Sequence, residues 1–187
     1  MPTEPIESRL KFVFNDDWKV FQYDRHLDYR AKIIKLTPTK AVDFVAVYEP
    51  KKLLYFIEVK NFRKSRVQNK SRMANGELGH EIAAKVRDTI AGVVAAYHRG
   101  NTDDWGAAFT RLATQEPSVR VLLWLEDDLF SKGPQGRRFD ALTSINKELK
   151  KQLQWLTSSV FVKSLAVNGR LDGLEVSYLS DDLSDNF

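Results

Sequence analysis

Residues 41 to 63 read AVDFVAVYEPKKLLYFIEVKNFR, and this stretch decides the fold. Its two apolar parts, 41 to 48 and 53 to 60, are rich in the β-branched and aromatic residues that favour strands. Between them lies Glu49-Pro50-Lys51-Lys52. Pro50 fixes a negative φ, which suits a type I turn and conflicts with the positive φ values of a two-residue hairpin turn. The stretch therefore predicts a β-hairpin with a four-residue loop.

The loop length sets the register of this hairpin. Tyr48 then lies opposite Leu53, and continued pairing places Asp43 directly opposite Glu58. Opposed residues have Cβ atoms roughly 4.5 to 5.5 Å apart, and like charges at that separation are destabilising. Side chains alternate along a strand, so Lys60 shares the face of the two carboxylates. The hairpin therefore predicts a site in which a divalent cation neutralises Asp43 and Glu58, with Lys60 beside it.

These residues resemble the signature of a known family. Asp43, a gap of fourteen residues and then Glu58-Val59-Lys60 at the end of an apolar strand are similar to the motif of the PD-(D/E)XK phosphodiesterase superfamily, the restriction-endonuclease-like nucleases. The resemblance implies that Asp43 and Glu58 bind magnesium, that the Val59 carbonyl joins them, and that Lys60 activates or orients the attacking water. Val42 stands where the family has proline. The implied fold is α/β (mixed α+β), a restriction-endonuclease-like core with a central mixed sheet flanked by helices.

A plainer interpretation stands beside this one. Glu-x-Lys at a strand end is commonly a solvated terminus, and a strand Asp can be an edge charge that discourages aggregation. However, Asp43 lies within an apolar run, where a carboxylate without a partner costs free energy. Clustered ionisable groups of this kind point to a functional site.

The resemblance also draws attention to residues outside the hairpin. In this family a helix before the first core strand often adds an acidic residue, and the candidates are Asp24 and Asp28. A helix-capping role or a surface charge is the alternative for each. The helix after the Glu-x-Lys strand commonly presents a Lys or Gln to the site, and Lys85 has that placement. Its alternative is an i,i+4 pair with Glu81.

A basic segment follows the hairpin. Residues 51 to 72 hold eight Lys or Arg and one Glu, a balance of +7 in a chain whose net charge is +4. The part after Lys60, NFRKSRVQNKSRMANG, has no regular apolar period and predicts a loop. A solvated loop is the alternative to phosphate binding, which supplies affinity without reading sequence. The candidate phosphate-binding residues are Arg63, Lys64, Arg66, Lys70 and Arg72.

The remaining elements follow from periodicity and turn signals. Residues 10 to 14 and 18 to 23 predict two short strands, or a strand and the start of a helix. Asn168-Gly169 between apolar runs predicts a C-terminal hairpin. The other expected elements are a short helix within 24 to 36, helices over 81 to 98, 102 to 112 and 139 to 156, and a strand over 119 to 125 that is covered on both faces.

Composition bounds the class of protein. With 187 residues and 43% hydrophobic content, the chain is expected to form one domain, 1 to 187. The absence of cysteine excludes disulfides, thiolate metal sites and cysteine nucleophiles. There is no signal-peptide pattern and no apolar run near the roughly 18 residues of a membrane span. The expectation is a soluble, cytoplasmic protein that does not associate with membranes.

Three functional hypotheses follow. The first is a magnesium-dependent nuclease, with manganese as a substitute, in which Asp43, Glu58, Lys60 and Lys85 form the catalytic group. Its expected substrate is DNA, with RNA as the alternative, and a homodimer would serve cutting of two strands. The second is a catalytically silent nuclease-like module that binds nucleic acid or a partner protein. The third is a structural or regulatory subunit in which Asp43, Glu58 and Lys60 are only a charge cluster.

Overall fold

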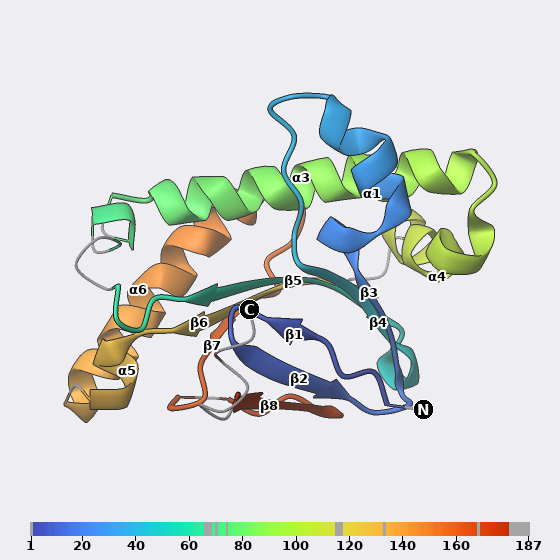
Figure 1. Cartoon of the computed structure of the whole chain (residues 1–187). Helices are drawn as coiled ribbons and strands as arrows, with labels where there is room; N and C mark the ends of the chain where they lie inside the picture. The colour runs from blue at the N-terminus through green and yellow to red at the C-terminus, as the bar shows by residue number, and fades with distance from the viewer. Residues whose placement is uncertain are drawn as a thin grey trace.

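The computed structural model describes residues 2–65, 69, 71–73, 75–114, 118–132, 134–167 and 169–179. Within them the chain has a mixed α+β architecture with two sheets flanked by helices (Figure 1). The larger sheet has the order β3-β4-β5-β6-β7, and the smaller sheet has the order β1-β2-β8. The strands are β1 (Ile6–Glu7), β2 (Leu10–Phe14), β3 (Trp18–Gln22), β4 (Phe44–Tyr48), β5 (Leu53–Asn61), β6 (Val119–Glu126), β7 (Val160–Lys163) and β8 (Leu174–Tyr178). The helices are α1 (Leu27–Ala31), α3 (Glu77–His98), α4 (Thr102–Ala113), α5 (Asp128–Lys132) and α6 (Gln135–Leu153), with 3₁₀ turns at Tyr23–Arg25, Ile33–Lys35 and Glu49–Lys51.

The central hairpin forms with the predicted register. Tyr48 pairs with Leu53 and Phe44 pairs with Ile57 across antiparallel β4 and β5. The loop is the 3₁₀ turn Glu49–Lys51 followed by Lys52 at φ 51°. β4 begins one residue later than Asp43, so Asp43 lies at its amino end rather than inside it.

Strand direction brings several chain segments to one edge of the larger sheet. β4 is antiparallel to both β3 and β5, while β6 and β7 are parallel to β5. The carboxyl ends of β3, β5, β6 and β7 therefore meet the amino end of β4. This edge carries Asp24 after β3, Asp43 before β4, and Glu58 and Lys60 near the end of β5.

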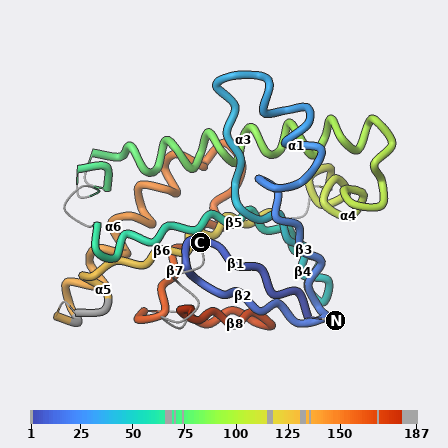
Figure 2. Tube along the Cα trace, in the orientation of Figure 1, coloured from blue at the N-terminus to red at the C-terminus, as the bar shows by residue number. Residues whose placement is uncertain are grey.

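Both faces of the larger sheet are covered, which the predicted alternation of side chains explains. Val45 and Phe56 belong to the core on the helical side, together with Val86 of α3. Phe44 and Ile57 belong to the core that includes the aromatic residues of β2. The Cα trace shows the smaller sheet and the helices on opposite sides of the larger sheet (Figure 2). β6 is accordingly buried on both faces, as its apolar sequence predicts.

The three long helices lie close to their predicted places. α3 begins at Glu77, four residues before the predicted start, and buries its stripe of Ile82, Val86 and Val93. Together with α4, it forms the crossover from β5 to parallel β6 that parallel strands require. α4 is capped by Asn101, whose side chain accepts a hydrogen bond from the Asp104 backbone amide. Within the described residues, no helix has both the length and the apolarity to cross a membrane.

The predicted C-terminal hairpin is wrong. β7 pairs in parallel with β6, whereas β8 pairs antiparallel with β2 in the other sheet. The two strands pair at the edges of different sheets, so tertiary pairing overrides the local turn signal at 168 to 169. Residue 168 itself lies outside the described residues. Residues 10 to 14 and 18 to 22 are both strands, but they belong to different sheets.

Candidate metal centre

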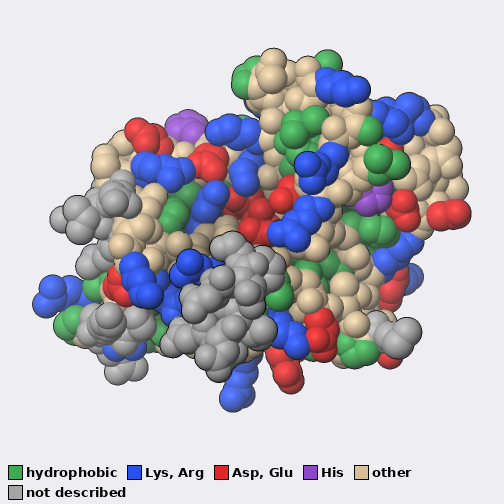
Figure 3. Space-filling view, viewed as in Figure 1, with side chains coloured by type: hydrophobic (Ala, Val, Ile, Leu, Met, Phe, Trp, Pro, Cys, Tyr) green, Lys and Arg blue, Asp and Glu red, His purple; other side chains and the backbone are tan. Residues whose placement is uncertain are grey.

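The structure brings Asp43 and Glu58 together at the edge of the sheet. The Val59 backbone amide, directly after Glu58, donates a hydrogen bond of 2.6 Å to Asp43 Oδ2. Both side chains are nearly inaccessible, with exposed fractions of 8% for Asp43 and 1% for Glu58. In the space-filling view, acidic side chains gather near the middle of one face and basic side chains surround them (Figure 3). The hairpin thus places two carboxylates side by side, as its register predicts.

The two oxygens of Glu58 have different surroundings. Oε1 lies 2.6 Å from Lys85 Nζ and 2.9 Å from Lys60 Nζ. Among the residues that the structure describes, Oε2 is buried and has no hydrogen-bond partner. A buried carboxylate oxygen without a partner is costly, and such an oxygen in a native protein calls for an explanation such as an ion.

Lys85 points from α3 to Glu58 and does not form the alternative pair with Glu81. Glu81 instead lies 3.0 Å from Lys60 Nζ and also contacts the Arg72 guanidinium. Burial alone would lower the pKa of Lys60, but Glu58 and Glu81 outweigh burial and raise this pKa above its ordinary value. Lys60 is therefore an ammonium group at neutral pH.

Of the two upstream acidic candidates, Asp24 joins the cluster. The Tyr23 backbone amide donates to the Asp43 carbonyl at 2.8 Å, which brings the next residue, Asp24, beside Asp43. Oxygens of Asp24, Asp43 and Glu7 lie within 4.8 Å of one another. Glu7 is a residue that the sequence analysis missed. Its place depends on the pairing of β1 with β2 in the smaller sheet, which the sequence analysis did not predict.

The carboxylates disturb one another's ionisation. Burial, followed by the charges of Glu58 and Glu7, raises the pKa of Asp43 to about 8, although Lys85 and the Val59 amide oppose the shift. Burial and then Glu7 also raise the pKa of Asp24. The charged forms of these groups are thus disfavoured in the absence of a cation, since like charges and low dielectric both oppose ionisation.

Asp28 lies apart from this cluster and has a structural role. Its carboxylate accepts hydrogen bonds from Trp105 Nε1 at 2.9 Å, from Asn101 Nδ2 at 2.7 Å and from Lys32 Nζ at 2.9 Å. Burial would raise the pKa of Asp28, but these hydrogen bonds together outweigh burial and hold this pKa well below its usual range. Asp28 therefore ties α1 to the start of α4.

The basic segment is only partly described. The Arg63 guanidinium lies 3.6 Å from the centre of the Tyr178 ring. The Lys64 backbone amide donates to Asp128 Oδ2 at 2.9 Å, and Arg72 contributes to the ion pairs around Glu81. Arg66 and Lys70 lie outside the described residues.

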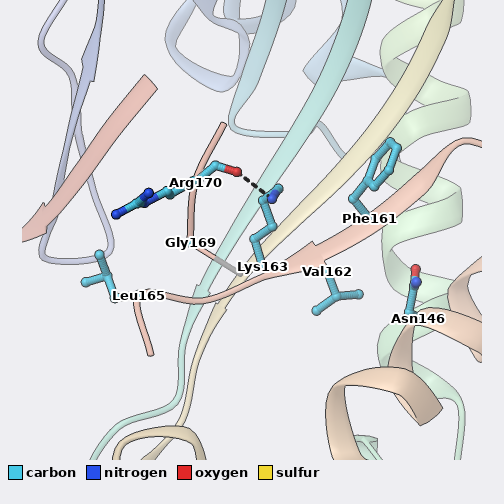
Figure 4. A pocket seen from close by; sticks show the side chains of 7 residues that line it. All are labelled: Asn146, Phe161, Val162, Lys163, Leu165, Gly169 and Arg170. Atoms are coloured by element: carbon cyan, nitrogen blue, oxygen red, sulfur yellow. Dashed lines mark hydrogen bonds between the residues drawn. The ribbon is translucent and has the colours of Figure 1, made fainter. Parts of the chain in front are cut away.

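A separate pocket of about 650 Å³ lies beside β7 (Figure 4). Lys163 Nζ donates to the Arg170 carbonyl at 2.6 Å within it. None of the described residues that line this pocket carries a carboxylate, so its chemistry differs from that of the cluster at the sheet edge. The lining residues are Asn146, Phe161, Val162, Lys163, Leu165, Gly169 and Arg170.

Comparison with known proteins adds little to this geometry. No protein-family model matches the sequence, and no solved structure matches the chain. Among curated proteins, the chain is similar to a cysteine–tRNA ligase from Neisseria meningitidis serogroup A, with 26% identity over 150 residues. The match covers 66% of this chain and 21% of the ligase, so the chain spans about a fifth of that protein's length.

Proposed function

We propose that this chain is a divalent-cation-dependent nuclease that hydrolyses phosphodiester bonds of DNA and that its larger sheet is a restriction-endonuclease-like core. The observation that carries the proposal is the environment of Glu58. This carboxylate is buried beside Asp43 and directs one oxygen at two ammonium groups, while its other oxygen has no partner within the described part of the chain. The order of hairpin, crossover helix α3 and parallel strand β6 supports the same core.

The side chains present suit a hard divalent cation. Magnesium and manganese favour carboxylate and carbonyl oxygens, and the site offers Asp43, Glu58 and, by the family resemblance, the Val59 carbonyl. When bound, such an ion stabilises charge on the phosphate and lowers the pKa of a bound water. Lys60 and Lys85 both contact Glu58 Oε1, which leaves Oε2 for the ion.

The lysines supply fixed positive charge to the same site. Lys60, whose raised pKa keeps it protonated, would orient the attacking water and stabilise negative charge on the phosphate. Lys85 would hold Glu58 in its orientation. Arg63, Lys64, Arg66, Lys70 and Arg72 would bind the phosphate backbone and leave base identity unread.

The substrate is proposed from the family resemblance, which favours DNA, and the same resemblance motivates a homodimer. The similar curated protein is named for a tRNA, so RNA belongs in the substrate panel.

The test is cleavage of supercoiled plasmid, linear duplex, single-stranded DNA and tRNA, each with magnesium, with manganese and with EDTA. The variant is Glu58→Gln, and the matched control is Glu175→Gln, which changes an exposed Glu of β8. We expect wild type and control to cut at least one substrate with either ion, and Glu58→Gln to lose at least a hundredfold in rate. Salt-sensitive binding without cleavage by any protein would select the silent module instead.

A further inference from the structure

We propose that the open edge of β7 binds an extended acidic segment of a partner protein, which adds to the larger sheet as a further strand. The pocket of about 650 Å³ beside β7 would hold this segment. The inference goes beyond the proposed nuclease function and does not depend on it. In the sheet order, β6 separates β7 from β5, the strand that carries Glu58 and Lys60.

The backbone of β7 has peptide groups that point away from the sheet. β7 is the last strand of the larger sheet, and β6 is its neighbour. The Val121 amide of β6 donates to the Ser159 carbonyl at 3.1 Å. Because peptide groups alternate in direction along a strand, Phe161 and Lys163 also direct theirs at β6, whereas Val162 directs its N–H and C=O away. No described residue pairs with these two groups of Val162, and such an edge is a template for another strand.

The pocket lies along this open edge. Phe161 and Lys163 project from one side of β7 and Val162 projects from the other, and all three line the pocket (Figure 4). A pocket bordered by side chains from both faces of one strand lies at the edge of that strand. Its volume falls within the range of about 300 to 1,000 Å³ that ligand pockets have. An extended segment beside Val162 therefore has room to bind.

The backbone on either side of Val162 limits the length of the pairing. Ser164 and Val167 exchange two backbone hydrogen bonds of 3.1 Å in the turn after β7. Before it, the Val160 amide donates to the Ser158 carbonyl at 3.0 Å. The open edge is thus a short ladder centred on Val162. A partner would pair over few residues, so side-chain contacts must supply much of the specificity.

Charge around the pocket selects an acidic segment. Lys163 and Arg170 line the pocket, and none of its described lining residues carries a carboxylate. Asp172, two residues beyond Arg170, is paired with Lys51 at 2.7 Å. Side chains alternate along an added strand, so those on the side of Lys163 would be Glu or Asp and those on the side of Val162 would be apolar.

The same features disfavour two other occupants. Two-fold pairing of β7 with a second copy of the chain would bring Lys163 and Arg170 close to the same residues of that copy, and like charges across an interface oppose association. Nucleic acid would match the charge, but it has no peptide groups to continue the ladder from Val162. An acidic peptide satisfies both the charge and the backbone.

The test is binding of a fluorescein-labelled peptide of alternating valine and glutamate to the full chain, measured by fluorescence polarisation. Val162→Pro removes the outward N–H and leaves the hydrogen bonds to β6, and proline is tolerated at sheet edges for this reason. The matched control is Val162→Thr, which keeps the N–H and the shape of the side chain. We expect saturable binding by wild type and Val162→Thr, and binding weaker by about tenfold or more by Val162→Pro.

A second variant tests the charge without altering β7. Arg170 is exposed, so Arg170→Glu should fold normally and bind the acidic peptide about tenfold more weakly. Arg170→Lys is its control and should bind like wild type. A peptide of alternating valine and lysine should bind wild type more weakly than the acidic peptide does. Thermal unfolding shows that each variant is folded.

The contrary outcomes are distinct. Lack of saturable binding of the acidic peptide by wild type, or equal affinities of Val162→Pro and Val162→Thr, would overturn the inference. A wild-type dimer that Val162→Pro converts to a monomer would assign the edge to a second copy. Displacement of the peptide by single-stranded DNA that Val162→Pro still binds would assign the pocket to nucleic acid. Either of the last two results would also overturn the acidic peptide as occupant.

Discussion

At the scale of single residues, Asp43 and Asp28 show how the surroundings of two buried carboxylates can differ. Asp43 is buried beside Glu58 and near Glu7, and its pKa is raised. Asp28 is equally buried, but three donors surround it and its pKa is lowered. The direction of the pKa shift therefore separates a buried carboxylate beside other carboxylates from one whose charge is compensated by hydrogen-bond donors.

Asp43→Asn should stabilise the protein when no divalent cation is present. The amide is neutral at every pH, so folding no longer has to bury the charge of Asp43 or neutralise it with a proton, and the amide oxygen can still accept the hydrogen bond from the Val59 amide. We expect the free energy of unfolding in EDTA to rise by about 1 to 3 kcal/mol, the usual scale for an uncompensated buried group. Urea unfolding of wild type and Asp43→Asn in EDTA measures this difference in the free energy of unfolding. A less stable variant would mean that the charge of Asp43 is already compensated.

The same substitution should abolish stabilisation by magnesium. Wild type is expected to melt at a higher temperature with magnesium than with EDTA, since an ion that binds only the folded state stabilises it. Glu175→Gln is the control and should keep this difference.

Asp28 should make the protein sensitive to acid. Its folded pKa is below the value of about 4 found in unfolded chains, so its contribution is present above pH 4 and is lost as the pH falls through the folded pKa. Asp28→Asn should cost about 1.5 to 3 kcal/mol at pH 7, the range for hydrogen bonds to a charged group. We expect this difference to shrink below pH 4 in urea unfolding. An equal difference at pH 7 and pH 3 would contradict the explanation.

At the scale of secondary-structure elements, local signals were predictable and non-local pairing was not. The hairpin of β4 and β5 follows from a proline in a short loop between two apolar strands, so its register and the facing of Asp43 and Glu58 could be derived. The position of Glu7 could not be derived from the sequence, because β1 belongs to a sheet whose strands β2 and β8 lie at opposite ends of the chain. The same pairing removes β8 from the predicted C-terminal hairpin.

Close packing of α3 against the site is a second feature that the sequence did not reveal. A Cβ built on Gly92 would lie 1.9 Å from the hydroxyl oxygen of Tyr23, which is fully buried. Tyr23 precedes Asp24 and donates its backbone amide to the Asp43 carbonyl. The glycine therefore allows the helix to pass over the residues that hold two of the carboxylates.

Gly92→Ala should destabilise the protein despite the better helix propensity of alanine. Propensity favours alanine by about 1 kcal/mol, whereas overpacking a buried site costs about 1 to 3 kcal/mol. Gly106→Ala in α4 is the matched control, since a Cβ there meets no atom within 4 Å, and it should be neutral or stabilising. Thermal unfolding of the two variants compares them directly. Equal stability of the two variants would show that Tyr23 can move freely.

At the scale of the whole molecule, the three layers explain why the charges gather at one edge. The larger sheet is apolar on both faces, because helices cover one face and the smaller sheet covers the other. The buried carboxylates Asp43 and Glu58 therefore lie near strand ends. The edge of the sheet where they lie collects the carboxylates of four chain segments, namely β1, the turn after β3, the start of β4 and the end of β5.

The most direct test of the proposed function is plasmid cleavage by wild type and by Lys60→Ala, with Mn²⁺ and DNA binding measured on the same preparations. Lys60 contacts Glu58 and Glu81 and is assigned to the attacking water. We expect magnesium-dependent cutting by wild type and a loss of at least a hundredfold in rate in Lys60→Ala, with both bindings nearly unchanged. Absence of cutting by wild type with either ion, or equal rates for the two proteins, would contradict the proposed function.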